Sequence, residues 1–365
     1  MTLPALDDPA RYLMRPARSD DLDALERFAV ASAHGITTLP ADRAALADRL
    51  ARSQHAFASA DDASGEEIYL FVLEDLALGR VVGTSGITAS AGFGGQFYAF
   101  RNEVIVHGNA ALGLSNRMHT LHLCHDLTGV TLLTSFYIEP AYEHTLAPQL
   151  LSRGRLLFIA EFVERFSERV AAESPGLADD TGHCPFWNAV GRQFFDMDYP
   201  VAEKLAGGRS KSFIAALMPP APIYVAVLPK AAQWAIGQLH PVAELPFSIL
   251  QDEGFDADTW VDVFDAGPIV EARLATLHSV ARARHLSSAE GRHAGQEGEA
   301  ADGRPRLCLI SSPHRDRFRA MLGRVGETAA HLPTALARQI DLGPGALARV
   351  APMSLNALTR GGRHD

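Results

Sequence analysis

Apolar residues recur along this chain with two different periods, and the period changes from segment to segment. Spacings of three and four residues behind acidic caps predict helices over 20–33 and 42–55. Short apolar runs separated by glycine-containing turns and loops predict strands at 68–73, 80–87, 97–101 and 103–107. Helices and strands are therefore interleaved, which indicates a mixed α/β sheet rather than an all-parallel one.

The middle of the chain combines a continuous apolar run with a long amphipathic stretch. Residues 132–138 are short and apolar, which predicts a buried strand. Apolar residues then return every three or four positions over 150–170, so we expect one helix there, ended by Pro175-Gly176. Three aromatic residues with a spacing of four are expected to pack in the core: Phe158, Phe162 and Phe166.

The second half of the chain shows shorter elements. Helices are expected over 229–236 and 246–254, and strands over 212–218, 223–227, 260–264, 306–310 and 318–325. A Gly/Ala/Glu/Ser-rich stretch without apolar periodicity predicts a flexible linker. We therefore expect four parts: an N-terminal domain over 11–200, a second α/β part over 201–286 that completes the same fold, the linker over 287–305, and a small β-rich appendage over 306–356.

Charge and cysteine usage narrow the class of protein. The formal charge is −10 with a pI near 5.8, which argues against nucleic-acid binding because that needs a basic face. Three well-separated cysteines without a C-x-x-C pair favour a reducing compartment. The N-terminus lacks the apolar core of a secretory signal, and no apolar run reaches the ~18 residues of a membrane span. We therefore expect a cytoplasmic protein without a membrane partner.

The join between the 132–138 strand and the following helix is the first candidate site. Acyl-CoA-dependent N-acyltransferases hold CoA where a strand separates from its neighbour and leads into a helix N-terminus, whose backbone N–H groups bind the pyrophosphate. That helix usually begins with an Arg/Gln-x-x-Gly-x-Gly/Ala loop. The matching positions here are Glu143, Leu146 and Pro148, so the chain has the strand and the helix without the glycines.

Eight short segments follow one another in a distinctive order: Gly35–Pro40, Tyr69–Asp75, Phe100–Glu103, Cys124–Gly129, Ser152–Phe158, Pro185–Arg192, Gly237–Pro241 and Asp262–Pro268. In order and spacing, they resemble the arginine N-succinyltransferase family from about Met14 to about Ala283. The resemblance implies an acyl-CoA N-acyltransferase (GNAT)-like mixed sheet with flanking helices. It also implies transfer of a succinyl group from succinyl-CoA to the α-amine of L-arginine or L-ornithine, in arginine catabolism.

The resemblance also assigns two residues. The histidine of the family's Gly-Gln-x-His-Pro motif is taken as the proton donor and corresponds to His240. A position on the strand before the CoA-binding helix touches succinyl-CoA and corresponds to Phe136. From the sequence alone, an imidazole before a proline at a predicted helix end favours a structural role, whereas the family match favours catalysis.

The departures from the family pattern point to its alpha-type subunits. Members with a single chain, and beta-type members, read Arg-x-Gly-Gly-Asn-Gly before the helix and Ser-Asn-Asp where this chain has Cys124–Asp126. The alpha type shares both changes. We therefore expect an alpha-type subunit that works with a beta-type paralogue or as a homo-oligomer. The alternative is a non-catalytic structural or regulatory subunit of a heteromeric enzyme.

Four cationic residues are further candidates for binding the substrates. Arg153 and Arg155, near the start of the long helix, are suited to the phosphates of CoA, or they are simply solvated. Arg209 and Lys211 are candidates for the succinyl carboxylate. A cluster of His119, His122, Cys124 and His125 suggests a metal site, but on a strand these side chains diverge, so no metal is expected.

Overall fold

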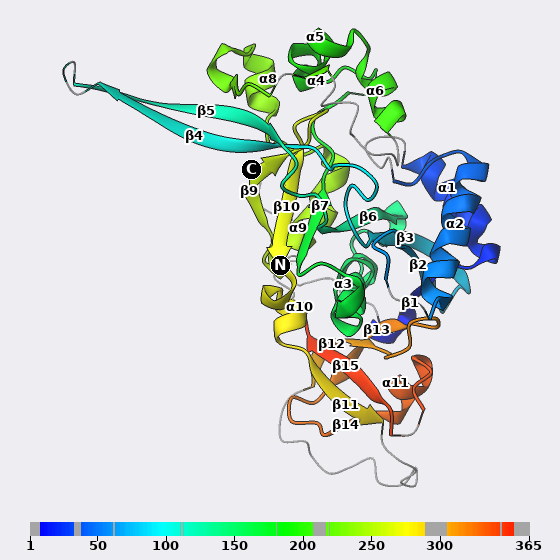
Figure 1. The fold of residues 1–365 in the computed structure, drawn as a ribbon. Helices are drawn as coiled ribbons and strands as arrows, with labels where there is room; N and C mark the ends of the chain where they lie inside the picture. The colour runs from blue at the N-terminus through cyan, green and yellow to red at the C-terminus, as the bar shows by residue number, and fades with distance from the viewer. Residues whose placement is uncertain are drawn as a thin grey trace.

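The computed structural model describes residues 8–32, 38–60, 63–109, 111, 113–179, 181–206, 217–218, 220–288, 305–343 and 345–353. Its strands form one fifteen-stranded sheet in the order β14-β11-β15-β12-β13-β1-β2-β3-β6-β7-β10-β9-β4-β5-β8 (Figure 1). The first seven strands are β1 (Tyr12–Pro16), β2 (Ile68–Asp75), β3 (Arg80–Thr88), β4 (Ala99–Asn109), β5 (Leu114–Cys124), β6 (Thr131–Ile138) and β7 (Arg169–Glu173). The others are β8 (Ile223–Tyr224), β9 (Asp256–Val261), β10 (Pro268–Arg273), β11 (Arg284–Ser288), β12 (Arg306–Ser311), β13 (Ala320–Val325), β14 (His331–Leu332) and β15 (Leu347–Pro352).

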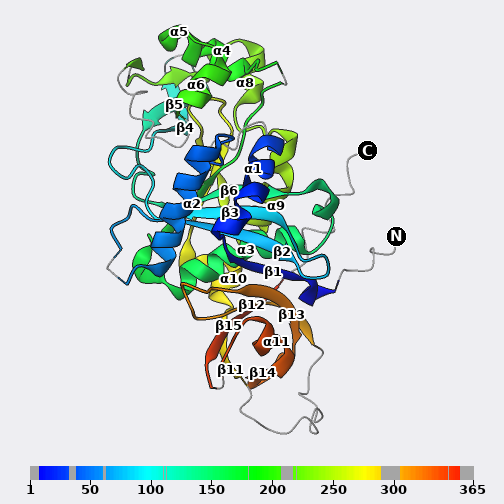
Figure 2. The same cartoon turned by 90° about the vertical axis from the view of Figure 1, so that its right-hand side faces the viewer.

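Helices cover the sheet in separate groups (Figures 1 and 2). They are α1 (Leu22–Ala31), α2 (Arg43–Ala58), α3 (Ala147–Glu161), α4 (Pro185–Ala189), α5 (Gly191–Phe195), α6 (Tyr199–Ala206), α8 (Lys230–Ala235), α9 (Glu244–Glu253), α10 (His278–Ala281) and α11 (Thr334–Gln339). α1 and α2 pack on β2 and β3, while α4, α5, α6 and α8 cluster near the base of β4 and β5. α3 is buried along almost its whole length, so it is the central helix of the structure.

Two strand pairs are parallel, and the rest are antiparallel. The parallel pairs are β6 with β7 and β11 with β14. At the C-terminal end, β13 pairs with β1 through Leu13↔Met321 and Met14↔Ala320. The C-terminal strands therefore extend the same sheet, together with α11. Most of the expected linker, residues 289–304, lies outside the described residues.

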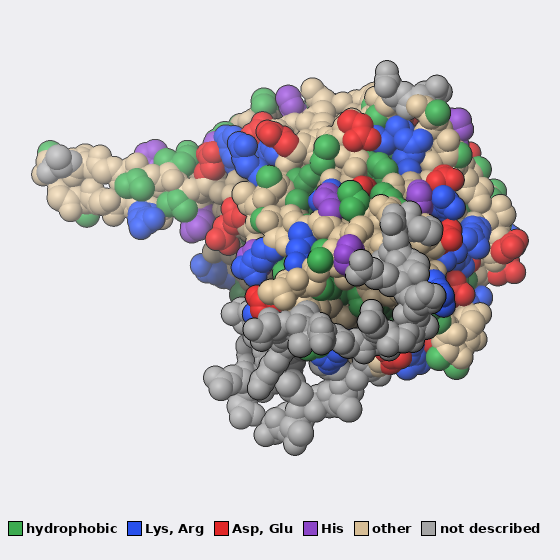
Figure 3. Space-filling view, turned by 90° about the horizontal axis from the view of Figure 1, so that it is seen from below, with side chains coloured by type: hydrophobic (Ala, Val, Ile, Leu, Met, Phe, Trp, Pro, Cys, Tyr) green, Lys and Arg blue, Asp and Glu red, His purple; other side chains and the backbone are tan. Residues whose placement is uncertain are grey.

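β4 and β5 form a long two-stranded ribbon that projects from the body (Figures 1 and 3). In the described part of the chain, the ribbon pairs with other strands only at its base, with β9 at Phe100 and Arg101 and with β8 at Thr120 and Leu121. Exposed apolar side chains lie farther out, at Val104, Val106 and Leu114. Within the described residues, no helix is long and apolar enough to cross a membrane.

Most of the expected elements are present. The two N-terminal helices, the 68–87 hairpin and the buried 132–138 strand are confirmed as α1, α2, β2–β3 and β6. The helix expected to end at Gly254 is confirmed as α9, and Gly254 has the left-handed backbone of a helix end (φ 103°). The strands expected over 306–310 and 318–325 are confirmed as β12 and β13. The expected 223–227 and 260–264 strands are displaced or shortened, and most of the 212–218 strand lies outside the described residues.

Two expectations were wrong. The runs at 97–101 and 103–107 are not two strands but parts of the single strand β4, whose partner is β5. The helix expected to reach Val170 ends at Glu161, and Arg169–Glu173 forms β7 beside β6. Val163, placed on that helix by its spacing, is exposed.

The three phenylalanines with a spacing of four do pack in the core, as expected. Phe158 lies at the centre of an aromatic cluster, with ring centroids within 4.9–5.9 Å of Phe57, Tyr69, Phe71, Phe162, Phe166 and Phe318. These residues come from α2, β2, α3 and the segments that follow α3 and precede β13. The cluster therefore joins the N-terminal and C-terminal parts of the sheet around α3.

Phe158→Ala should lower the free energy of unfolding by about 3–5 kcal/mol, because it leaves a cavity where six rings meet. Chemical denaturation measures this change. The control is Val163→Ala, whose side chain is 56% exposed and should change stability by less than about 0.5 kcal/mol. Equal effects of the two substitutions would contradict the central role of Phe158.

Candidate active site

A β-bulge interrupts β6 at Ser135. Opposite β3, Thr134 pairs with Gly86 and Tyr137 pairs with Thr84, so β6 holds one more residue than its partner. Ser135 has a left-handed backbone (φ 53°), an unusual conformation for a residue with a side chain. It is held by Thr38: the Ser135 N–H donates to Thr38 Oγ1 and the Ser135 hydroxyl donates to the Thr38 carbonyl, each over 3.0 Å.

The bulge redirects the side chains that follow it. Leu133 packs in the core cluster around α3, and Phe136, three residues later, packs against the same cluster. Tyr137 instead stacks near Phe28 of α1, with ring centroids 5.1 Å apart. Without the extra residue, strand alternation would put Leu133 and Phe136 on opposite faces. The bulge therefore turns Phe136 toward α3.

Beside the bulge, β6 and β7 separate. They pair only at Thr131↔Val170 and Leu132↔Ala171. β7 continues along β10 as far as Glu173, whereas β6 continues along β3. A cavity of about 110 Å³ lies in this divergence.

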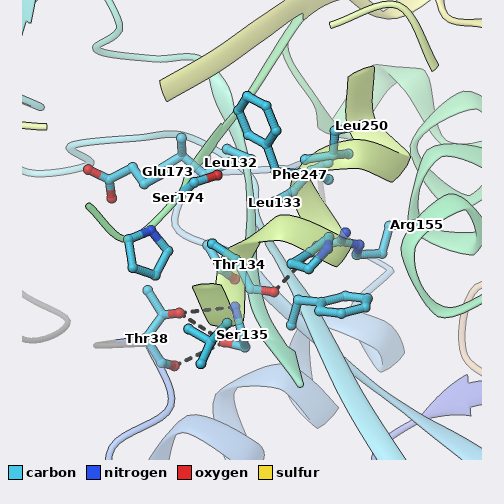
Figure 4. A pocket seen from close by; sticks show the side chains of 16 residues that line it. Thr38, Leu132, Leu133, Thr134, Ser135, Arg155, Glu173, Ser174, Phe247 and Leu250 are labelled. Carbon is cyan, nitrogen blue, oxygen red and sulfur yellow. Dashed lines mark hydrogen bonds between the residues drawn. The ribbon is translucent and has the colours of Figure 1, made fainter. Parts of the chain in front are cut away.

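The cavity is lined by four parts of the chain (Figure 4). These are residues 132–136 of β6 with Thr38, Arg155 of α3, residues 172–175 at the end of β7, and one side of the segment 242–250 that ends in α9. Phe247 and Leu250, three residues apart on α9, supply apolar surface opposite the strands. The cavity is therefore mostly apolar, with a few polar groups at defined places, as is usual for sites that bind small molecules.

Among the described residues that line this cavity, Arg155 is the one cation. Its side chain is fully buried, and each of its three nitrogens donates to a neutral acceptor. Nε donates to the Ser152 carbonyl and Nη2 to Ser152 Oγ, both over 3.1 Å, and Nη1 donates to the Thr134 carbonyl over 3.5 Å. The guanidinium carbon lies 5.6 Å from the centre of the Phe136 ring. Burial lowers the pKa of Arg155 to about 9.

Arg153, two residues earlier, has different surroundings although it is equally buried. Its Nε donates to Glu253 Oε1 over 2.5 Å, and Nη1 contacts Gln149. Glu253 also accepts from the N–H and hydroxyl of Ser279. Arg153 therefore joins α3 to α9 and α10, and it does not line the cavity. Arg209 and Lys211 lie outside the described residues.

His240 lies beside the cavity. Its N–H donates to the carbonyl of Pro175, at the end of β7, over 2.9 Å. Its Nδ1 accepts from the N–H of Val242 over 3.3 Å, so the side chain caps a short helical turn, Pro241–Ala243. Val242 and Ala243 line the cavity, and His240 is partly exposed. In the neutral ring, an accepting Nδ1 leaves the proton on Nε2, which is then a donor.

The N-terminus of α3 has lost donors that an anion would need. Thr145 Oγ1 already accepts from the N–H of Ala147, the first residue of the helix, over 3.1 Å. Pro148, the second residue, has no N–H. Leu146, Ala147 and Pro148 are also buried. Two of the free donors of a first helical turn are therefore missing.

The histidine and cysteine cluster is spread along β5. His119 Nδ1 lies 3.5 Å from Asn102, and His122 Nε2 lies 3.1 Å from Thr120 Oγ1 and 3.3 Å from Glu103. In the part of the chain that the structure describes, no three His, Cys, Asp or Glu side chains converge as metal ligands would.

Asp265 fixes the loops at the rim of the site, a role that sequence reasoning missed. Its buried carboxylate accepts from the N–H groups of Gly176 and Gly267 over 2.8 and 2.7 Å. The next residue, Ala266, accepts from the N–H of Gly237, just before His240. Burial, and then the nearby Asp262, raise the pKa of Asp265 to about 7. The only sequence signal for this role was the Asp-Ala-Gly-Pro turn itself.

Stability should depend on pH through Asp265. An unfolded aspartate titrates near 4, so between about pH 4 and 7 the folded chain holds a proton that the unfolded chain has released. The free energy of unfolding should therefore fall across this window and level off above pH 7. Denaturation of Asp265→Asn at several pH values should give a flatter profile than the wild type.

Asp258→Asn, which changes an exposed aspartate, is the control for the pH profile and should keep the wild-type slope. Asp265→Asn should also be less stable than the wild type at low pH. Both carboxyl oxygens of Asp265 accept a hydrogen bond from a backbone N–H, and the amide NH₂ that replaces one of them cannot accept. Parallel profiles for Asp265→Asn and the wild type would contradict the raised pKa.

Comparison with known proteins places this site in a family. The family model described as arginine N-succinyltransferase beta subunit matches residues 12–279. The chain is 45% identical over 343 residues to the arginine N-succinyltransferase subunit alpha of Pseudomonas aeruginosa, covering 93% of this chain and 98% of that protein. It is 36% identical over 342 residues to subunit beta of the same organism, covering 94% and 98%.

A solved structure agrees with this result. The arginine/ornithine succinyltransferase subunit AI from Pseudomonas aeruginosa is similar with a TM-score of 0.80 and 41% identity, over 94% of this chain and 99% of that one. The matched residues 12–279 include the bulge, the cavity, Arg155 and His240. The chain belongs to the arginine N-succinyltransferase family.

Proposed function

We propose that this chain transfers a succinyl group from succinyl-CoA to the α-amine of L-arginine or L-ornithine, as an alpha-type subunit. The observation that supports it best is the cavity between the diverging parallel strands β6 and β7, next to the His240 loop. Diverging strands of this kind are how GNAT-like acyltransferases hold an acyl-CoA, and we propose that relationship for this sheet. The comparisons favour a transferase over a purely structural subunit.

In this proposal, the pantetheine arm lies along β6 beyond Leu132, where β7 no longer pairs with it. Hydrogen bonds to a strand backbone do not depend on side-chain identity, so the loss of the glycine loop does not remove this part of the site. Phe136 lies in the cavity lining and offers apolar surface to the arm near the thioester.

The reaction then needs two proton transfers. The amine nitrogen attacks the thioester carbonyl carbon, a C–N bond forms, and the C–S bond breaks. The amine must lose a proton to water or another base, and the CoA thiolate must gain one. We assign the second transfer to His240, because imidazole titrates near neutral pH and its protonated form can give a proton to the thiolate and become neutral.

A second subunit fits the same proposal. The relatives include proteins named subunit alpha and subunit beta, and this chain aligns with both over nearly their full length. We propose a beta-type paralogue as the partner, with a homo-oligomer as the alternative. Turnover of succinyl-CoA with arginine, by the isolated chain and then with a beta-type partner, tests the activity directly.

His240→Ala should lower kcat about 10²–10⁴-fold, the usual range for a general acid, because the thiolate leaves without a proton. Thermal unfolding should stay close to that of the wild type, since the side chain is partly exposed. His285→Ala, an exposed imidazole near Glu161, is the control and should keep full turnover. An unchanged kcat for His240→Ala in the active assembly would remove His240 from the mechanism.

S-succinyl-pantetheine should be almost as good a donor as succinyl-CoA, because α3 offers few donors to the pyrophosphate. We expect the two values of kcat/KM to differ by less than about tenfold, which is less than about 1.4 kcal/mol of transition-state binding. Steady-state kinetics with both donors measures the ratio. A loss of more than a hundredfold without the nucleotide would show that the phosphates are bound elsewhere on this chain.

A further inference from the structure

Arg155 carries a buried charge that no carboxylate in the described part of the chain balances. Its donors meet two carbonyls and one hydroxyl, all neutral. Two other buried arginines face acids: Arg153 pairs with Glu253, and Arg165 lies 3.8 Å from Glu67. Arg49 of α2 also has two buried guanidinium nitrogens without a hydrogen-bond partner in the described residues, but it does not line the cavity. A buried charge without a counter-charge is strongly unfavourable, so its presence calls for an explanation.

The position of Arg155 supplies one, because the guanidinium borders a cavity whose remaining lining is mostly apolar, with Glu173 and several hydroxyl groups as its other polar side chains. Leu133 and Phe136 of β6 and Phe247 and Leu250 of α9 are among the side chains around it. One cation at a fixed place in an apolar cavity suits a ligand with a short hydrocarbon segment and a negatively charged end. The planar guanidinium is well suited to a carboxylate, which it can bind through two N–H groups.

The size of the cavity decides between the anions of an acyl-CoA. A cavity of about 110 Å³ is similar in size to an engineered cavity of about 150 Å³ that binds benzene, so a four-carbon acyl group is of the right order. Arg155 also lies in the third turn of α3, away from the helix N-terminus at which acyl-CoA pyrophosphates usually bind.

We propose that Arg155 binds the terminal carboxylate of the acyl group and so selects succinyl-CoA over donors with uncharged acyl groups. The inference rests on the proposed function and makes it more specific. The two methylene groups of the succinyl chain lie against the apolar wall, and the thioester lies at the Phe136 end of the cavity. Bound carboxylate supplies the counter-charge that Arg155 lacks.

The first test compares two donors that differ only in this carboxylate. We expect the wild type to prefer succinyl-CoA to butyryl-CoA by about 10²-fold or more in kcat/KM. Arg155→Met keeps the length of the side chain without its charge, and it should lower kcat/KM for succinyl-CoA about 10²-fold. The value for butyryl-CoA should be unchanged or higher, so the preference collapses. Arg155→Lys should retain part of it, because a point charge replaces the planar fork.

The control is Arg165→Met, which removes an equally buried arginine that bonds Tyr69 and does not line the cavity. It should lower thermal stability and leave the donor preference unchanged, whereas Arg155→Met should not lower the stability of the ligand-free chain. An equal loss for both donors in Arg155→Met, or an unchanged ratio, would overturn the role of Arg155.

A binding readout separates this inference from the proposed function. Free succinate at millimolar concentration should raise the unfolding temperature of the wild type, and butyrate should not. Arg155→Met should lose the succinate effect. If the wild type shows this pattern but no turnover, the carboxylate site is supported and the proposed activity is rejected. If the wild type turns over succinyl-CoA but Arg155→Met keeps both the succinate effect and the donor preference, the carboxylate site is rejected.

Discussion

The separation of β6 and β7 after Leu132 is the constraint on which the rest of the site depends. Two parallel strands normally remain paired, because an unpaired backbone group away from water is unfavourable. Here the bulge at Ser135 keeps β6 bound to β3 while β7 follows β10. The unpaired edge, the cavity and the direction of Phe136 all follow from this geometry. A continuous ladder would leave no room for any of them.

The His240 and Asp265 loops keep that divergence open on the β7 side. The carbonyl of Pro175 is bound by the N–H of His240, and the N–H of Gly176 is bound by Asp265. Gly267 packs so closely on this segment that a Cβ there would lie 2.2 Å from the carbonyl oxygen of Ser174. Backbone groups at the end of β7 are thus satisfied by loops rather than by β6. The same contacts position the backbone of His240, so the shape of the cavity and the place of the proposed proton donor are linked.

The sequence predicted the strand that carries the site but not the strand beside it. Residues 132–138 are continuous and apolar, and this signal is clear for a buried strand. β7 has only five residues, and its Val170 continues a spacing of three and four from Leu156 through Val163, which favours a helix. The left-handed backbone at Ser135 has no sequence signal either, because it is stabilised by hydrogen bonds with Thr38, which is distant in the sequence.

Family resemblance singled out His240 and Phe136; Phe136 lines the cavity and His240 lies next to it, while their roles remain predictions. The resemblance gave no way to distinguish Arg153 from Arg155. The two residues lie two positions apart on a buried helix, so their side chains leave the helix axis in directions about 200° apart. One faces Glu253 of α9 and the other faces the cavity. Only the position of the neighbouring elements decides which charge is paired.

The N-terminus of α3 has few free N–H donors, whereas its third turn carries Arg155 at the cavity. Together these two features affect which part of an acyl-CoA the chain can recognise. A helix N-terminus that binds pyrophosphate recognises the part of the donor that all acyl-CoA molecules share. In this chain, Thr145 and Pro148 remove donors from that end, while in the proposed binding mode Arg155 places a charge where the acyl groups differ. Binding energy on the shared part lowers KM for every donor, whereas binding energy on the acyl end discriminates between them. An arrangement of this kind reduces general affinity for CoA and concentrates selectivity on the transferred group.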